Sequence, residues 1–172
     1  MFKKLQECKN LKEIVLPKNV TSVGTYAFSG CTSLKSIIFN DGLESIGNYA
    51  FNGCSSLSTI AFNDELNSIG SYAFQNCTKL TTLNFSKKLA TIGAYAFNGC
   101  TGLTGDLTIP SSVTSIGNRA FYNCTGLNGK LTIEGNEVAT TIGEYAFCGC
   151  KNITTLDLGD GITSIGNYAF QN

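Results

Sequence analysis

A short pattern that recurs seven times at nearly constant spacing constrains this chain more than any other feature of its sequence. The pattern is glycine, any residue, tyrosine, alanine and phenylalanine, with arginine in place of the tyrosine in one copy. It begins at Gly24, Gly47, Gly70, Gly93, Gly117, Gly143 and Gly166, and only two of the steps between these glycines depart from the common period. A cysteine follows the phenylalanine by three residues in the first six copies, and Cys8 lies one period before the first of them, Cys31. Seven copies at a period within the range of about 20–50 residues predict a repeat architecture.

Large apolar residues alternate with other residues in each unit, and this period of two is typical of a strand with one buried face. The alternating pairs are Ile14 and Leu16, Ile37 and Phe39, Ile60 and Phe62, Leu83 and Phe85, Leu107 and Ile109, Leu131 and Ile133, and Leu156 and Leu158. We predict seven parallel strands in one sheet, centred on the residues between the members of each pair. These central residues are Val15, Ile38, Ala61, Asn84, Thr108, Thr132 and Asp157.

The rest of each unit predicts a second short strand and a turn. A shorter alternation precedes each glycine, as in residues 43–47, and the Tyr-Ala-Phe stretch after the glycine fits one short helical or 3₁₀ turn. One coil cannot bury its own apolar edge, so the coils must stack around a continuous core. The sequence therefore predicts an α/β repeat solenoid that forms a single domain over residues 1–172.

Composition and charge argue against most catalytic and nucleic-acid-binding functions. Twelve basic residues balance twelve acidic ones, so the basic surplus that phosphate binding normally needs is missing. The chain contains no histidine, the commonest general base and metal ligand. No segment approaches the ~18–20 consecutive apolar residues that a membrane helix requires. We expect no enzymatic activity, no cofactor, no metal and no membrane insertion.

Seven of the eight cysteines share one repeat position and are expected to form a ladder of buried free thiols, because their side chains would point the same way. Disulfides or zinc remain alternatives for this ladder. Cys148 stands outside it and leaves a reactive thiol open. Six tyrosines form a second column, in which Arg119 replaces one member and is expected to stack between Tyr95 and Tyr145. Asp41, Asp64 and Glu65 are expected to form a solvated edge rather than a catalytic pair.

Residues between the inward-pointing apolar positions are the candidate ligand-binding residues, because they vary from unit to unit whereas structural residues repeat. They form two neighbouring columns on the outer face of the predicted sheet. The first column is Val15, Ile38, Ala61, Asn84, Thr108, Thr132 and Asp157. The second column includes Glu13, Asp106 and Lys130. One end of this face is apolar and the other polar, which suits contact with a protein or a glycan better than catalysis.

The unit, which runs from Leu34 to Cys54 and again from Leu80 to Cys100, resembles the BspA-like leucine-rich repeat over essentially the whole chain. This resemblance implies a curved solenoid with its sheet on the concave side. It also implies a surface or secreted protein that binds other proteins through that face, including host extracellular matrix proteins. A structural spacer within a larger surface protein is the alternative function.

The chain ends and the insertions yield further expectations. The lysines at the start, Lys3 and Lys4, have no apolar stretch after them, so a signal peptide is not expected there. Residues 3–7 are expected to cap the first coil, and residues 134–139 to form a surface insertion. The last unit stops at Asn172, before its cysteine, which favours a fragment of a longer protein or self-association through an exposed solenoid end.

Overall fold

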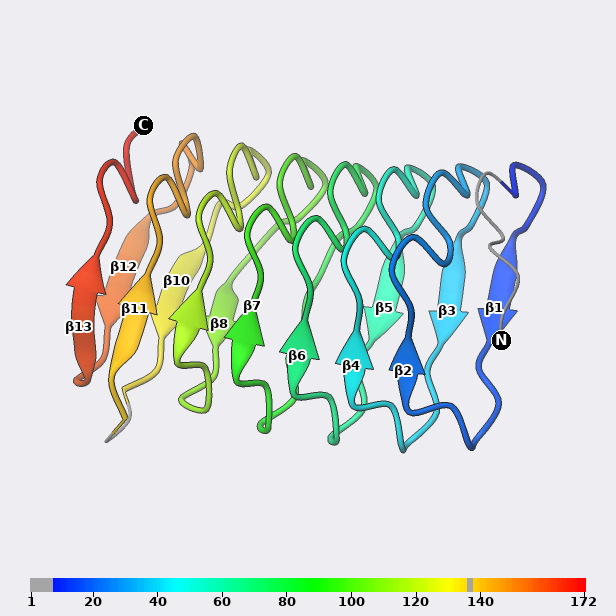
Figure 1. Cartoon of the computed structure of the whole chain (residues 1–172). Coiled ribbons are helices and arrows are strands. Elements are labelled where there is room, and N and C mark those ends of the chain that lie inside the picture. The colour runs from blue at the N-terminus through cyan, green and yellow to red at the C-terminus, as the bar shows by residue number, and fades with distance from the viewer. Residues whose placement is uncertain (1–7, 136–137) are drawn as a thin grey trace.

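The computed structural model describes residues 8–135 and 138–172, which form a parallel β-solenoid of seven coils. Two rows of strands run in opposite directions along its two sides (Figure 1). The first strands of the coils are β1 (Glu13–Val15), β3 (Ser36–Ile38), β5 (Thr59–Ala61), β8 (Leu107–Ile109), β10 (Lys130–Ile133) and β12 (Thr155–Leu158). The second strands are β2 (Ser22–Val23), β4 (Ser45–Ile46), β6 (Ser68–Ile69), β7 (Thr91–Ile92), β9 (Ser115–Ile116), β11 (Thr140–Ile142) and β13 (Ile162–Ile165). The predicted solenoid of stacked parallel strands is confirmed.

The continuous sheet is built from the second strands, not from the first as predicted. Strands β2, β4, β6, β7, β9, β11 and β13 form one seven-stranded sheet. The first strands form two three-stranded sheets, β1-β3-β5 and β8-β10-β12, and residues 82–85 of the fourth coil belong to neither. After the fourth coil, the segment that joins the turn to the first strand becomes longer. Leu83 follows Leu80 by three residues, whereas Leu107 follows Leu103 by four. This extra residue separates the fourth coil from β8, whereas the third and fourth coils have the same spacing and are nevertheless unpaired.

The turn after each repeat glycine contains no helix in the described residues, so the predicted helical or 3₁₀ turn and the α/β class are wrong. The second residue after that glycine has a positive φ of 55–60° in all seven coils, and it is tyrosine in six coils and Arg119 in the fifth. A right-handed helix needs a negative φ at every residue. One left-handed residue in each turn therefore stops a helix before it begins.

Columns of identical side chains fill the core between the two rows of strands. The buried phenylalanines Phe51, Phe74, Phe97, Phe121 and Phe147 stack on one another, with ring centroids 5.0–5.3 Å apart. Phe39, Phe62 and Phe85 form a second stack whose rings meet the first column edge-on at 5.8–6.1 Å. Offset stacks and edge-to-face pairs are the favoured aromatic geometries. Each coil thus buries its apolar surface against its neighbours.

Neighbouring coils approach each other most closely at the repeat glycines. A Cβ atom on Gly70 would lie 2.7 Å from the backbone nitrogen of Asn48, which real side chains do not allow. Gly24 in the first coil has open space at the same position, with no heavy atom within 4 Å of a built Cβ. The glycine is therefore required by stacking on a preceding coil.

Two expectations about the ends of the array have different outcomes. Leu156 and Leu158, the inward-facing pair of the last strand, are 43% and 36% exposed because no described coil covers that side of β12, as expected for an exposed solenoid end. The expected cap at residues 3–7 and part of the expected insertion, residues 136–137, lie outside the described residues. In the described part of the chain, no helix has the length and apolar character needed to cross a membrane.

Candidate protein-binding face

The predicted binding residues lie side by side on the outer surface of the first strands, which we call the first-strand face. Strand pairing places Val15 beside Ile38, Ile38 beside Ala61, and Thr132 beside both Thr108 and Asp157. The intervening residues point inward, as the period of two predicts. All ten predicted residues are exposed except Thr132, which is half-buried. The assignment of this face to the concave side of the solenoid stays a prediction.

The apolar part of this face lies on β1, β3 and β5. Val15 is 64% exposed and Ile38 is 53% exposed, and they are adjacent through parallel pairing. Their neighbours in the chain, Ile14 and Ile37, are buried in the core. Because the core already has its own aliphatic residues, Val15 and Ile38 are not needed to close it.

The polar part of the face lies on β8, β10 and β12. Lys130 Nζ lies 2.6 Å from an Asp157 carboxylate oxygen, and the Lys130 backbone N–H donates a hydrogen bond to Asp106 Oδ1 at 2.7 Å. These charges therefore already have partners within the chain. Asn84 lies in the unpaired fourth coil, so the ten residues do not share one continuous sheet.

Two lysines beside the apolar part were missed by the sequence analysis. Lys12 and Lys35 are exposed, and they lie in adjacent coils because the Lys35 backbone N–H donates to the Lys12 carbonyl at 2.8 Å. Neither side chain has an ion pair or a hydrogen bond with a described residue. A visible signal was present, since Lys-x-x-aliphatic occurs at Lys12–Val15 and recurs one period later at Lys35–Ile38.

The tyrosine column runs along the turns, away from the first-strand face. Tyr26, Tyr49, Tyr72 and Tyr95 stack with ring centroids 4.5–4.6 Å apart. The guanidinium of Arg119 lies 5.5 Å from the Tyr95 ring centroid and 4.7 Å from that of Tyr145, which confirms the predicted cation–π contacts. Arg119 also donates a hydrogen bond to the Tyr95 hydroxyl at 2.5 Å. The rings pack mainly on one another, so the column serves packing.

The cysteine ladder is a feature of the core. All eight cysteines are free thiols, and six of the seven in the ladder are buried, as predicted. The thiols of Cys54, Cys77 and Cys100 donate to phenylalanine carbonyls of the preceding coil at 3.1–3.3 Å. Burial raises the pKa of Cys54 and of Cys100 to about 12, so both thiols stay protonated near neutral pH. Cys148 is half-buried.

The acidic turn residues form a solvated edge. Glu65 pairs with Lys88 at 2.7 Å, and both side chains are about half exposed. Asp41 and Asp64 are exposed. Within the described ranges, no three His, Cys, Asp or Glu side chains come together in a way that could hold a metal ion.

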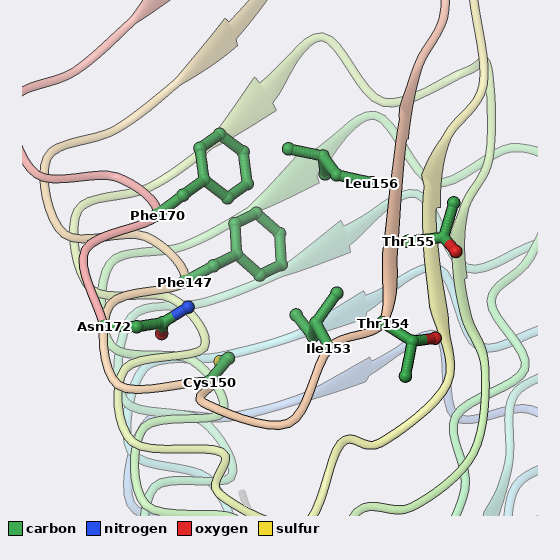
Figure 2. A pocket seen from close by; sticks show the side chains of 8 residues that line it. All are labelled: Phe147, Cys150, Ile153, Thr154, Thr155, Leu156, Phe170 and Asn172. Atoms are coloured by element: carbon green, nitrogen blue, oxygen red, sulfur yellow. The ribbon is translucent and has the colours of Figure 1, made fainter.

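A cavity of about 240 Å³ lies at the last coil. Phe147 and Phe170 reach into it from one side and Leu156 from the other, and Ile153 and Cys150 lie lower in the view (Figure 2). Its lining is core side chains together with Thr154, Thr155 and Asn172. Without a charged group, it is the open end of the core rather than a chemical site.

Comparisons with known proteins agree with this architecture. A family model described as the BspA type leucine-rich repeat region matches residues 2–128 and 128–172, with six copies. A leucine-rich repeat protein of Treponema pallidum is 31% identical, with a TM-score of 0.82 over 91% of this chain and 74% of that one. One from Eubacterium ventriosum is 35% identical, with a TM-score of 0.81 over 93% of this chain and 42% of that one. A comparison with curated protein sequences gives no match.

Proposed function

Because this chain belongs to the family of BspA-type leucine-rich repeat proteins, we propose that it is a non-catalytic binding module that contacts a protein through its first-strand face. The pair Val15 and Ile38 carries the proposal, since both are large aliphatic side chains exposed on neighbouring strands. Apolar groups that stay exposed in a folded chain, although the core is complete without them, are typical of contact surfaces. Partner binding would remove them from water.

The site of action follows from the same family membership and is part of the proposal. We place the protein at the cell surface or outside the cell, where this face, as the concave side, would meet a host or extracellular matrix protein. A spacer role between other domains is the competing function, and the polar half of the face, with Asn84, Thr108 and Thr132, is compatible with it.

The test is a charge substitution in the apolar pair. Val15→Asp combined with Ile38→Asp places two carboxylates where apolar side chains would be buried against a partner. Proteins captured by the immobilised chain from matrix extracts are identified by mass spectrometry, and the affinity of each purified partner is then measured. We expect the dissociation constant to rise by about tenfold or more, because charged groups at the centre of an interface lose contact area and are desolvated.

The matched control is Ser22→Asp combined with Ser45→Asp, which adds the same charges to adjacent strands of the second-strand sheet. Both double variants should unfold at nearly the same denaturant concentration as the original chain, since all four side chains lie outside the core. Equal loss of affinity in the two variants would move the contact away from the first-strand face. Saturable capture by none of the extracts would favour the spacer.

A further inference from the structure

We propose that the apolar half of the first-strand face binds a protein segment in which acidic side chains lie beside aliphatic ones. This inference rests on the proposed function and names the partner chemistry for the same face. It is carried by four side chains on two adjacent coils, Lys12 and Val15 in the first and Lys35 and Ile38 in the second.

The two lysines have no ion pair with any residue of the described ranges. The ion pairs of the described residues join Lys88 to Glu65 and Lys130 to Asp157, and neither of them involves Lys12 or Lys35. Lys12 and Lys35 lie next to each other, exposed, with no ion pair among the described residues. Two like charges on adjacent coils repel each other, and a bound carboxylate relieves that repulsion.

The position of the lysines gives the binding surface a direction. Lys12 and Lys35 immediately precede β1 and β3, whereas Val15 and Ile38 end these strands. At the other edge of the face, Asp41 in the second coil occupies the position equivalent to Lys18 in the first, so the two charges there have opposite sign. Glu13 is the one carboxylate between the lysines and Val15, and it pairs in register with the neutral Ser36. A partner would therefore place acidic groups over the edge of Lys12 and Lys35.

Only the first two coils combine these features. The residues equivalent to Lys12 are Ser58 in the third coil and Thr81 in the fourth. The residues equivalent to Val15 become Ala61 and then Asn84. The lysines thus end with the second coil, and Ala61 on β5 is the last apolar residue of the column before the first-strand sheet is interrupted, which limits the footprint to β1, β3 and β5.

The test compares three synthetic peptides with the same pair of leucines, followed by two glutamates, two glutamines or two lysines. Binding to the full chain is followed by backbone amide chemical shifts. We expect the glutamate peptide to bind about tenfold more tightly than the glutamine peptide, with shifts centred on residues 12–15 and 35–38. The preference should weaken as salt is raised from low to physiological concentration, because exposed charges are screened.

Two variants separate the charge from the apolar contact. Lys12→Gln with Lys35→Gln should remove the preference for glutamate while leaving the glutamine peptide unaffected. The control Lys79→Gln with Lys87→Gln alters two exposed lysines away from β1 and β3. It should change the affinity for neither the glutamate peptide nor the glutamine peptide. Val15→Asp with Ile38→Asp should abolish binding of both peptides.

Equal affinity for the three peptides, or shifts elsewhere on the chain, would overturn the proposed partner chemistry. The binding function itself would survive that result if Val15→Asp with Ile38→Asp still weakened capture of a natural partner. The binding function and the partner chemistry would both fail if Val15→Asp with Ile38→Asp changed neither peptide binding nor capture of a natural partner.

Discussion

At the scale of single residues, each repeat position does one structural task, and the task is visible in its contacts. The buried cysteine fills a small apolar space and donates its thiol to a carbonyl of the preceding coil, as Cys77 does to Phe51 at 3.3 Å. The tyrosine adopts a left-handed backbone and stacks its ring on the next coil. Because these residues repeat, successive coils make the same kinds of hydrogen bond and ring contact with one another.

Cys77→Ser should lower the free energy of unfolding by about 1–3 kcal/mol, because sulfur leaves the core and a more polar hydroxyl enters it. Guanidinium denaturation monitored by tyrosine fluorescence measures the change. Cys148→Ser is the matched control, since that thiol is half-buried and lies outside the ladder. A loss of stability equal to that of Cys148→Ser would show that the ladder position is tolerant of polarity.

At the scale of the element, the coil is the unit of folding, and the sequence predicted most of it. The period, the strands and the inward apolar residues follow from spacing alone, since Ile14 and Ile37 are buried while Val15 and Ile38 are exposed. The left-handed tyrosine did not follow, because positive φ favours Gly, Asn and Asp, and aromatic residues give no such signal. Likewise Leu83 and Phe85 alternate like any strand, and nothing in their own spacing indicates that the ladder is interrupted there. The unpaired Lys12 and Lys35 needed the strand register to become neighbours.

The close approach of neighbouring coils provides a sharp test of this packing. Gly70→Ala should destabilise the chain by about 1–3 kcal/mol, because its Cβ would overlap the backbone of the preceding coil. Gly24→Ala has no such overlap and should be close to neutral. The melting temperatures of the two variants are compared by thermal unfolding under identical conditions. Equal melting temperatures would contradict the inference that the repeat glycine is required by the close contact between coils.

At the scale of the whole molecule, the two ends of the solenoid are unlike each other in hydrogen bonding. The N–H groups of Tyr26 and Phe28 donate to carbonyls of the next coil at 3.0 and 2.8 Å, and this pattern repeats along the array. In the last coil the N–H groups of Tyr168 and Phe170 have no such acceptor in the described chain. A first coil presents the complementary carbonyls, so a second copy could continue the stack.

We therefore expect this chain by itself to associate head to tail at high concentration. Charge supports the same direction, since residues 1–38 contain six lysines and two glutamates, whereas residues 130–172 contain two lysines and five acidic residues. Sedimentation velocity over a hundredfold concentration range should show a rising average mass that falls again when salt is added. A constant monomer mass throughout would disprove the association.

The interruption at residues 82–85 gives the molecule an uneven mechanical character. The second strands pair continuously from β2 to β13, with one register shift between β11 and β13, so this side of the solenoid is joined along its whole length. The opposite side consists of two stiff plates, β1-β3-β5 and β8-β10-β12, joined by a segment without ladder hydrogen bonds. Any flexing of the array should concentrate at this seam, with the unbroken band as the fixed spine of the hinge. The three strands β1-β3-β5 would then move as one unit and β8-β10-β12 as another, on either side of this seam.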